Sequence, residues 1–275
     1  MMRLALTFHE EFGCSGEPML RERIIPSFEA LTPIIHQNRI PVFKPSVTPE
    51  IIRLVQQVHT PQYLDEVIGT GFYENALLSV SSVVTGAELL MSGYQSVFAY
   101  TGCAGHHAGQ TRFWGFCYLN DVAVTINHMR QKGLKRFLVL DIDPHFGDGT
   151  REFFQYDKDV IHINFHEGNQ SILDSFYSNY DYALNPGWDE EFIQVLSGAL
   201  KPEYEFDMMI VIFGHDSHHQ DYGGFCLWDP TYALLTKLIK DYAAGRPLLW
   251  VLSGGSDVAV ARTVIPEVVR VLVED

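Results

Sequence analysis

The chain has 275 residues and a formal net charge of −15, and the lack of a Lys/Arg stripe argues against nucleic-acid binding. Four cysteines lie far apart without a C-x-x-C pair, so neither a thiolate zinc site nor a disulfide framework is indicated, and we expect buried thiols. No apolar run is long enough for a secretory leader or a membrane span, which predicts a soluble, cytoplasmic protein without a membrane partner.

Short apolar runs separated by amphipathic stretches predict strands that are buried on both faces, as in a parallel sheet. They cover residues 3–8, 96–100, 136–142, 160–165, 208–213 and 248–252. Apolar residues at helical spacing predict helices over roughly 75–92, 119–130, 188–200, 230–244 and 262–273. The alternation predicts an α/β fold with helices on both faces of a mostly parallel central sheet, and the lack of a linker predicts a single domain over residues 1–275.

Polar clusters follow four of these predicted strands. They cover residues 102–107, 143–145, 214–219 and 253–256. Loops beyond the carboxyl ends of parallel strands converge at one edge of a sheet. We therefore expect the four clusters to form one functional site.

Two of the clusters carry candidate metal ligands. Asp143 and His145 alternate along a chain that we expect to be extended, so both side chains should leave the same face and bind one ion. Asp216, at the end of another strand, can complete the set. Two carboxylates and one imidazole suit zinc, although Fe²⁺ could use the same ligands, and three protein ligands leave a position for water. An ordinary helix cap or surface turn is the alternative for any one of these residues.

A second feature is the pair His106-His107. Beside a metal, such a pair offers a general base and an acid or electrostatic partner, because imidazole titrates near neutral pH. Each ring needs an orienting acceptor on its other nitrogen, and Asp141 and Asp148 are the available carboxylates. In isolation, a hydrogen-bonded pair in a turn would be the simpler interpretation.

At this point the sequence resembles the zinc-dependent histone deacetylase family, which also includes bacterial acetylpolyamine amidohydrolases and shares its fold with arginase. The motifs that carry the resemblance are GHHAG at 105–109, GFCYLNDVA at 115–123, LDIDPHFGDGT at 140–150, GHD at 214–216 and SGG at 253–255, with a weaker HTPQYL at 59–64. They occur in the family's order over most of the chain. The resemblance implies a three-layer α/β/α, arginase/deacetylase-like fold.

The resemblance also implies roles for the polar residues. Asp143, His145 and Asp216 would be the metal ligands. His106 and His107 would be the catalytic histidines, backed by Asp141 and Asp148 respectively.

Two further sites are implied only by the resemblance. Phe116 would line the mouth of an acyl-lysine tunnel, with Gly115 near the substrate. A structural potassium ion would lie close to the zinc site. Its ligands would be Asp141, the main chain at Asp143 and His145, and the segment around Asn164 and Phe165.

The chain departs from the family after Gly255, where a tyrosine usually polarises the scissile carbonyl. Here Ser256 holds that place, and its hydroxyl lies closer to the backbone. Losing one oxyanion donor typically costs about 10²–10³ in rate. Tyr222 stands where relatives commonly have proline, and it either turns its phenol inward as a replacement or anchors its loop. We expect these three residues to contact the substrate.

Two smaller departures lie near the predicted ligands. Phe146 replaces a histidine that is frequent in relatives. His215 is either a donor to the neighbouring ligand Asp216 or an ordinary core histidine.

Together these observations predict a metal-dependent amide hydrolase that removes acetyl or another acyl group from an amine such as acyl-lysine or acetylpolyamine. The serine at position 256 leaves two alternatives open: a weakly active or non-catalytic sensor of acylated ligands, and an esterase. The chain is short for the family, which implies short rim loops. A second copy in a homo-oligomer could cover the site.

Overall fold

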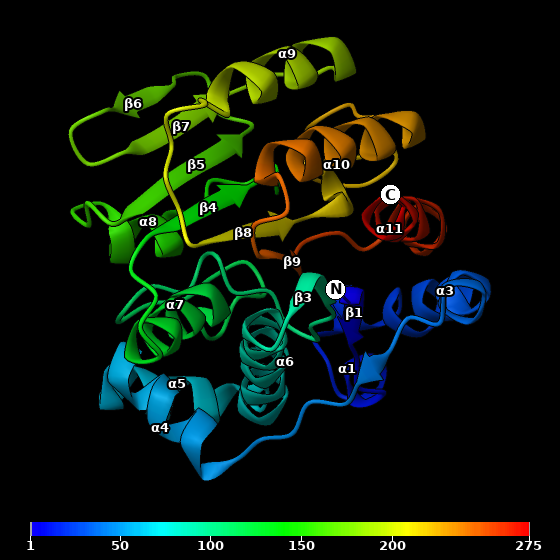
Figure 1. The fold of residues 1–275 in the computed structure, drawn as a ribbon. Helices are drawn as coiled ribbons and strands as arrows, with labels where there is room; N and C mark the ends of the chain where they lie inside the picture. The colour runs from blue at the N-terminus through cyan, green and yellow to red at the C-terminus, as the bar shows by residue number, and fades with distance from the viewer. Residues whose placement is uncertain (1, 275) are drawn as a thin grey trace.

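One nine-stranded sheet forms the centre of the structure, a computed structural model that describes residues 2–274 (Figure 1). Its strand order is β2-β1-β3-β9-β8-β4-β5-β7-β6, and all neighbours run parallel except β6 and β7. The strands are β1 Met2–Thr7, β2 Val42–Phe43, β3 Tyr94–Ala99, β4 Phe137–Asp141, β5 Val160–His166, β6 Ile172–Asp174, β7 Asn179–Ala183, β8 Met208–Phe213 and β9 Leu248–Leu252.

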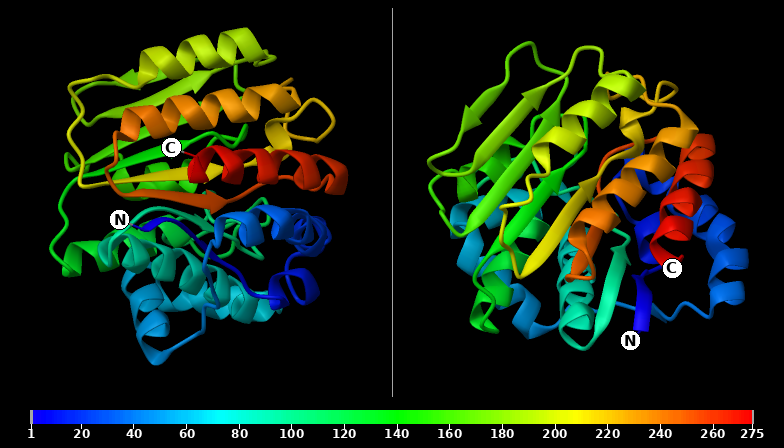
Figure 2. Two further views of the ribbon diagram at one scale, coloured as in Figure 1. Left: turned by 45° about the vertical axis from the view of Figure 1, so that its right-hand side comes forward. Right: turned by 45° about the horizontal axis from the view of Figure 1, so that its top comes forward.

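Helices cover both faces of this sheet. They are α1 Glu11–Cys14, α2 Pro18–Arg21, α3 Ile24–Asn38, α4 Pro49–Val58, α5 Pro61–Thr70, α6 Tyr73–Met91, α7 Asp121–Gln131, α8 Asp148–Phe154, α9 Asp189–Ala199, α10 Asp229–Ala243 and α11 Val258–Val273, with a 3-10 turn η1 at His215–Ser217. Helices α3, α9, α10 and α11 pack on one face, and α4 to α7 pack on the other (Figure 1 and Figure 2).

Strand β4 shows why the apolar runs are continuous. Leu138 and Leu140 belong to the core on the α3 and α9–α11 side, whereas Phe137 and Val139 belong to the core on the α4–α7 side. All four side chains are fully buried. Because alternate residues of β4 face two cores, this central strand has no polar face. The predicted α/β fold with three layers and a mostly parallel sheet is confirmed.

The predicted strands match the observed ones closely. Predicted strands 208–213 and 248–252 coincide with β8 and β9. The other four differ from β1, β3, β4 and β5 by one or two residues at one or both ends. The five predicted helices correspond to α6, α7, α9, α10 and α11, although α11 begins at Val258 rather than at residue 262.

Other elements were not predicted. Helices α4 and α5 each begin with a Thr-Pro pair, in which the hydroxyls of Thr48 and Thr60 accept hydrogen bonds from the backbone N–H groups of Ile51 and Tyr63. A threonine N-cap followed by proline is a recognisable helix start. Strands β2 and β6 are too short for a repeating pattern, with two and three residues.

One expectation about the cysteines is wrong. Cys103 and Cys117 are buried, but Cys14 is exposed at the end of the short helix α1.

Within residues 2–274, no helix combines the length and the apolar character needed to cross a membrane. The assignment of residues 1–275 to a single domain stays a prediction.

The aromatic core beneath the sheet generates a stability prediction. Phe213 on β8 is fully buried, and its ring contacts Phe98, Tyr232 and Trp250. Phe213→Ala should lower the free energy of unfolding by about 3–5 kcal/mol, because it removes buried surface and leaves a cavity. Phe176→Ala is the control, since that ring is 66% exposed, and should change stability by at most about 0.5 kcal/mol. Urea unfolding followed by circular dichroism measures both, and equal effects would contradict the assigned packing.

Candidate metal centre

Four neighbouring strands position the candidate site. In the order β3, β9, β8 and β4 they run parallel, so the loops after their carboxyl ends meet at one edge of the sheet. These loops carry the four polar clusters described above. The structure therefore brings together side chains that are far apart in the sequence.

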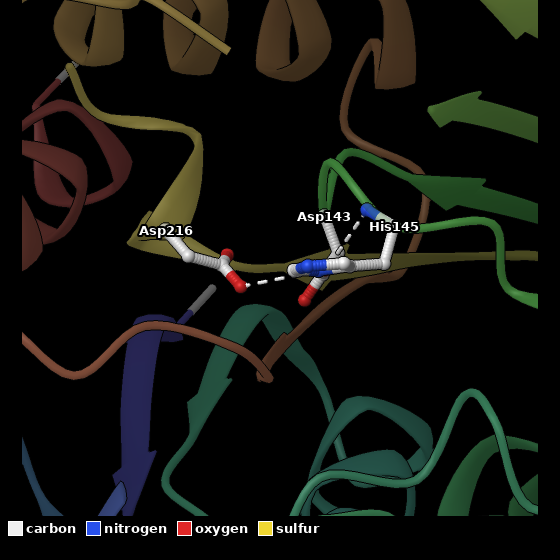
Figure 3. Close-up of side chains that lie close together, drawn as sticks. All are labelled: Asp143, His145 and Asp216. Atoms are coloured by element: carbon white, nitrogen blue, oxygen red, sulfur yellow. Dashed lines mark hydrogen bonds and ion pairs between the residues drawn. The ribbon is translucent and has the colours of Figure 1, made fainter. Parts of the chain in front are cut away.

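Asp143, His145 and Asp216 lie close enough to bind one ion (Figure 3). One possible ligand atom from each residue lies within 4.8 Å of the other two. His145 Nδ1 is 2.9 Å from Asp143 Oδ1 and 3.4 Å from Asp216 Oδ2. Both aspartates are buried, whereas the His145 side chain is 23% exposed and faces the cavity described below. The open side of the set is thus the side from which a small molecule can approach.

The local geometry of Asp143 and His145 differs from the expectation. Strand β4 ends at Asp141, and residues 143–145 lie in a bend rather than on an extended chain. Asp143 Oδ1 accepts a hydrogen bond from the backbone N–H of His145 at 3.1 Å. Such side-chain-to-backbone bonds are typical of aspartate turns. A tight turn, not strand alternation, brings the two side chains together.

The pKa values of Asp216 and His145 show that positive charge is favoured between the two carboxylates. Burial raises the pKa of Asp216 to about 6, and the neighbouring Asp143 adds to the rise while His145 opposes it. Burial lowers the pKa of His145, but hydrogen bonds to Asp143 and Asp216 outweigh it and raise that pKa to about 11. The His145 proton therefore supplies the positive charge between two carboxylates. A divalent cation would replace that proton.

Two features of the surroundings fit a metal ion. Both carboxylate oxygens of Asp216 are buried, and within the described part of the chain the one polar partner found for them is His145, with Nδ1 3.4 Å from Oδ2. A buried carboxylate in this state is unstable unless a cation meets it. A Cβ atom at Gly214 would lie 2.4 Å from an oxygen of each aspartate, so only glycine allows the backbone to approach this closely. Two carboxylates and one imidazole suit Zn²⁺ or Fe²⁺.

Beside the metal set, each of the paired histidines is held by its own carboxylate. His106 Nδ1 lies 2.9 Å from Asp141 Oδ2, and His107 Nδ1 lies 2.8 Å from Asp148 Oδ1. Both rings are almost fully buried, and their centroids are 4.0 Å apart. Because Nδ1 of each ring faces a carboxylate, Nε2 is the nitrogen left for the cavity that both residues line.

The two histidines differ in protonation. Burial lowers the pKa of His106, but the carboxylates of Asp143 and Asp141 outweigh it and raise that pKa to about 9. Burial and the neighbouring charge on His106 lower the pKa of His107 to about 4, against the opposing effect of Asp148. At neutral pH the pair therefore combines a charged His106 with a neutral His107 that can accept a proton.

Sequence reasoning missed the residues that hold Asp148. The indole N–H of Trp114 lies 3.0 Å from Asp148 Oδ1, and Arg112 donates a second hydrogen bond to Oδ2. Burial raises the pKa of Asp148, but the bonds from His107, Arg112 and Trp114 outweigh it and lower that pKa to about 2. Trp114 also stacks on His107 with ring centroids 3.7 Å apart. One tryptophan thus fixes both members of the His107–Asp148 pair.

A buried arginine supports the glycine-rich loop from below. The Arg23 side chain is fully buried, and its guanidinium donates to the carbonyl oxygens of Ser253 and Gly254. Gly254 in turn donates its backbone N–H to Asp143 Oδ2 at 2.9 Å. No local pattern around Arg23 indicates this role, because its acceptors lie at the other end of the chain.

A cavity of about 180 Å³ opens above the candidate ligands. Its lining consists of Leu20, Ala104, His106, His107, Trp114, Gly115, Phe116, Asp143, His145, Asp216, Tyr222 and Gly254. Gly115, Phe116 and Tyr222, which the sequence analysis predicts to contact the substrate, thus line this cavity. Gly255 lies next to the cavity, and its backbone N–H is 3.4 Å from the Tyr222 hydroxyl. The Ser256 hydroxyl instead lies 3.3 Å from Asp221.

The remaining predicted residues are also near the site. Asn164 accepts a hydrogen bond from the Gly147 N–H at 3.1 Å and donates to the Phe165 carbonyl at 3.3 Å, beside Asp141. Two of the predicted potassium ligands, Asp141 and Asn164, are thus neighbours on adjacent strands, and the potassium site stays a prediction. His215 is buried, with Nδ1 3.0 Å from Asp221 Oδ2.

Comparison with known proteins shows which family and which relatives this chain resembles. The family model of the histone deacetylase domain matches residues 42–272. The acetylpolyamine amidohydrolase of Mycoplana ramosa is 31% identical over 68% of this chain and 60% of its own length. A probable deacetylase of Archaeoglobus fulgidus is 26% identical over 80% of this chain and 71% of its own length.

The fold is shared with a solved structure. The crystal structure of the HDA15 HD domain superposes with a TM-score of 0.86 over 99% of this chain and 90% of that domain, at 23% sequence identity. This likeness establishes the three-layer fold independently of the motifs.

The geometry of the candidate ligands generates a metal-binding prediction. Asp143→Asn keeps the side-chain volume but removes one charged ligand, whereas Asp65→Asn makes the same change at an exposed position. Loss of an outer-shell partner alone costs about 10–100-fold in metal affinity, so Asp143→Asn should weaken zinc binding by at least about 100-fold. Competition against a chromophoric chelator measures the affinity. Equal zinc affinity in the two variants would show that Asp143 is not a ligand.

Proposed function

This chain belongs to the histone deacetylase family, and on that premise we propose that it is a metal-dependent hydrolase that removes an acyl group from an amine. The observation that carries the proposal is the placement of the Asp143, His145 and Asp216 set beside the two carboxylate-backed histidines, in one cavity. Metal ligands next to a proton acceptor are the parts that hydrolysis of an amide requires.

Asp143, His145 and Asp216 would hold the ion. When bound, Zn²⁺ or Fe²⁺ acts as a Lewis acid toward the acyl carbonyl and lowers the pKa of a water molecule. The protein's own contribution is to fix the ligands in a rigid, buried frame. Gly254 does this for Asp143 through its backbone N–H.

The two histidines would move the protons. His107, neutral at pH 7, accepts a proton from the water as the oxygen of that water bonds to the acyl carbon. The resulting imidazolium then donates a proton to the amine nitrogen as the C–N bond breaks. Asp148 keeps the His107 ring oriented throughout, and His106, held by Asp141, lies beside it. The products are a carboxylate and an ammonium.

The shape of the cavity supports a small acyl group on a linear amine. A volume of about 180 Å³ is small for a ligand site, and Trp114 and Phe116 supply aromatic walls. Acyl-lysine and acetylpolyamines both present a narrow acylated chain of this kind. The net charge of −15 favours the approach of a cationic amine over that of an anion.

Two accessory features complete the proposal. A potassium ion would lie near Asp141 and Asn164, where it would hold the loop that carries the metal ligands. A second copy of the chain would cover the cavity from the rim in a homo-oligomer. The proposal involves no nucleic acid.

Activity of the zinc-loaded chain tests the proposal. Fluorogenic acetyl-lysine and trifluoroacetyl-lysine peptides and N-acetylputrescine should be hydrolysed, and His107→Ala should lower kcat by about 10²–10⁴-fold because the general base is lost. Zinc content should be unchanged in this variant. His36→Ala, which removes an exposed histidine, is the matched control and should keep full activity.

The alternatives predict different outcomes. Binding of a hydroxamate without turnover of any amide or ester would favour a sensor of acylated ligands. Hydrolysis of esters alone would favour an esterase.

A further inference from the structure

We propose that Tyr222 is a catalytic residue whose phenolic hydroxyl stabilises the oxyanion that forms during hydrolysis, in place of Ser256. The inference rests on the proposed function. Hydrolysis of an amide places negative charge on the former carbonyl oxygen, and a preorganised donor at that position is a large part of the rate enhancement. The question is which donor in this cavity is free to act.

Ser256 is already engaged elsewhere. Its hydroxyl donates to Asp221 Oδ1 at 3.3 Å, and its backbone N–H donates to Asp221 Oδ2 at 3.1 Å. The backbone N–H of Asp257 donates to the same carboxylate at 3.0 Å. Three donors from two adjacent residues thus converge on Asp221. They turn Ser256 toward that carboxylate, whereas Gly254 lines the cavity.

Tyr222 lines the cavity, whereas Ser256 is not among its lining residues. It lines the same cavity as Asp143, His145 and Asp216, and its ring centroid lies 5.7 Å from that of His145. The backbone N–H of Gly255 lies 3.4 Å from the phenolic oxygen and donates to it. That contact uses an oxygen lone pair and leaves the hydroxyl hydrogen available. No acceptor for this hydrogen is found among the described residues.

The other donors that line the cavity are committed. The indole N–H of Trp114 is bonded to Asp148. His106 and His107 direct Nδ1 to carboxylates, and the proposed mechanism uses their remaining nitrogens for proton transfer. Among the described lining residues, Tyr222 alone carries a hydroxyl. Among these lining residues it is therefore the one neutral side-chain donor without another acceptor.

The loop that carries Tyr222 is fixed at both sides of the residue. The Tyr222 N–H donates to Asp221 Oδ1 at 2.9 Å, and the Gly223 N–H donates to the Asp216 carbonyl oxygen at 3.0 Å. The backbone at Tyr222 is thus tied to the main chain of a proposed metal ligand on one side and to the carboxylate that holds Ser256 on the other, while the Gly255 N–H contacts the phenolic oxygen. A donor held in this way loses little entropy when the oxyanion forms.

The step leaves the proton of Tyr222 in place. The water oxygen bonds to the acyl carbon, and the C=O π electrons move to the carbonyl oxygen. The Tyr222 hydroxyl donates a hydrogen bond to that oxygen without transferring its proton. When the C=O bond re-forms, the C–N bond breaks and the amine takes its proton from the imidazolium.

Tyr222→Phe isolates the hydroxyl, because it keeps the ring that forms the cavity wall. In the zinc-loaded full chain, this variant should lower kcat on an acetyl-lysine peptide by about 10²–10³-fold. The loss on trifluoroacetyl-lysine should be smaller, because fluorine already stabilises that oxyanion. Zinc content should match the wild type. Tyr156→Phe, at a side chain that is 72% exposed, is the matched control.

A binding measurement provides a second readout that does not need turnover. A trifluoromethyl ketone analogue of acyl-lysine binds as a hydrate that mimics the tetrahedral intermediate. Tyr222→Phe should weaken its affinity, measured by calorimetry, by about 10–100-fold, as expected for loss of a hydrogen bond to a charged group. Ser256→Ala tests the competing donor in both assays.

The outcomes are distinguishable. Unchanged kcat and unchanged ketone affinity in Tyr222→Phe would overturn the inference, as would the full loss in Ser256→Ala without one in Tyr222→Phe. A wild-type chain that hydrolyses none of the substrates but binds the ketone through the Tyr222 hydroxyl would refute the proposed function and support the placement of Tyr222.

Discussion

The close approach of two buried carboxylates is the constraint on which the rest of the site depends. Asp143 and Asp216 are both withdrawn from water, and burying either charge without a positive partner costs several kcal/mol. The protein supplies part of the compensation through the Gly254 N–H and through His145 between the two acids. Within the described chain, Asp216 has His145 as its one polar side-chain partner. A divalent cation would supply the positive charge that these two carboxylates need.

The order of the strands explains how such a centre arises from distant segments. β4 and β8 are neighbours, so the loops after them present Asp143 and Asp216 to each other, and β9 on the far side of β8 adds Gly254. The proposed proton-transfer pair follows β3, one strand further along. The proposed metal ligands and Tyr222 lie in the loops after β4 and β8, whereas Ser256 lies in the loop after β9. A change in one loop, such as serine at position 256, need not disturb the others.

The sequence predicted the features that have a local cause. Strands buried on both faces leave continuous apolar runs, and ordered motifs indicated the candidate metal ligands and the pairing of each histidine with an aspartate. Arg23, Trp114 and Asp221 were missed because their partners are remote in the sequence: the contacts exist only once the loops converge. The turn at residues 143–145 was mistaken for extended chain for a related reason, since the hydrogen bond that forms it depends on one side-chain rotamer.

Arg23 makes the glycine-rich loop dependent on a segment that is distant in the sequence. Both acceptors of its guanidinium, the carbonyls of Ser253 and Gly254, follow it by 230 and 231 residues, so they are synthesised later. Until they are present, this buried cation lacks the groups that solvate it. The contacts between Arg23 and this loop therefore form only after β9 has been synthesised, even where the earlier strands have already paired on the nascent chain.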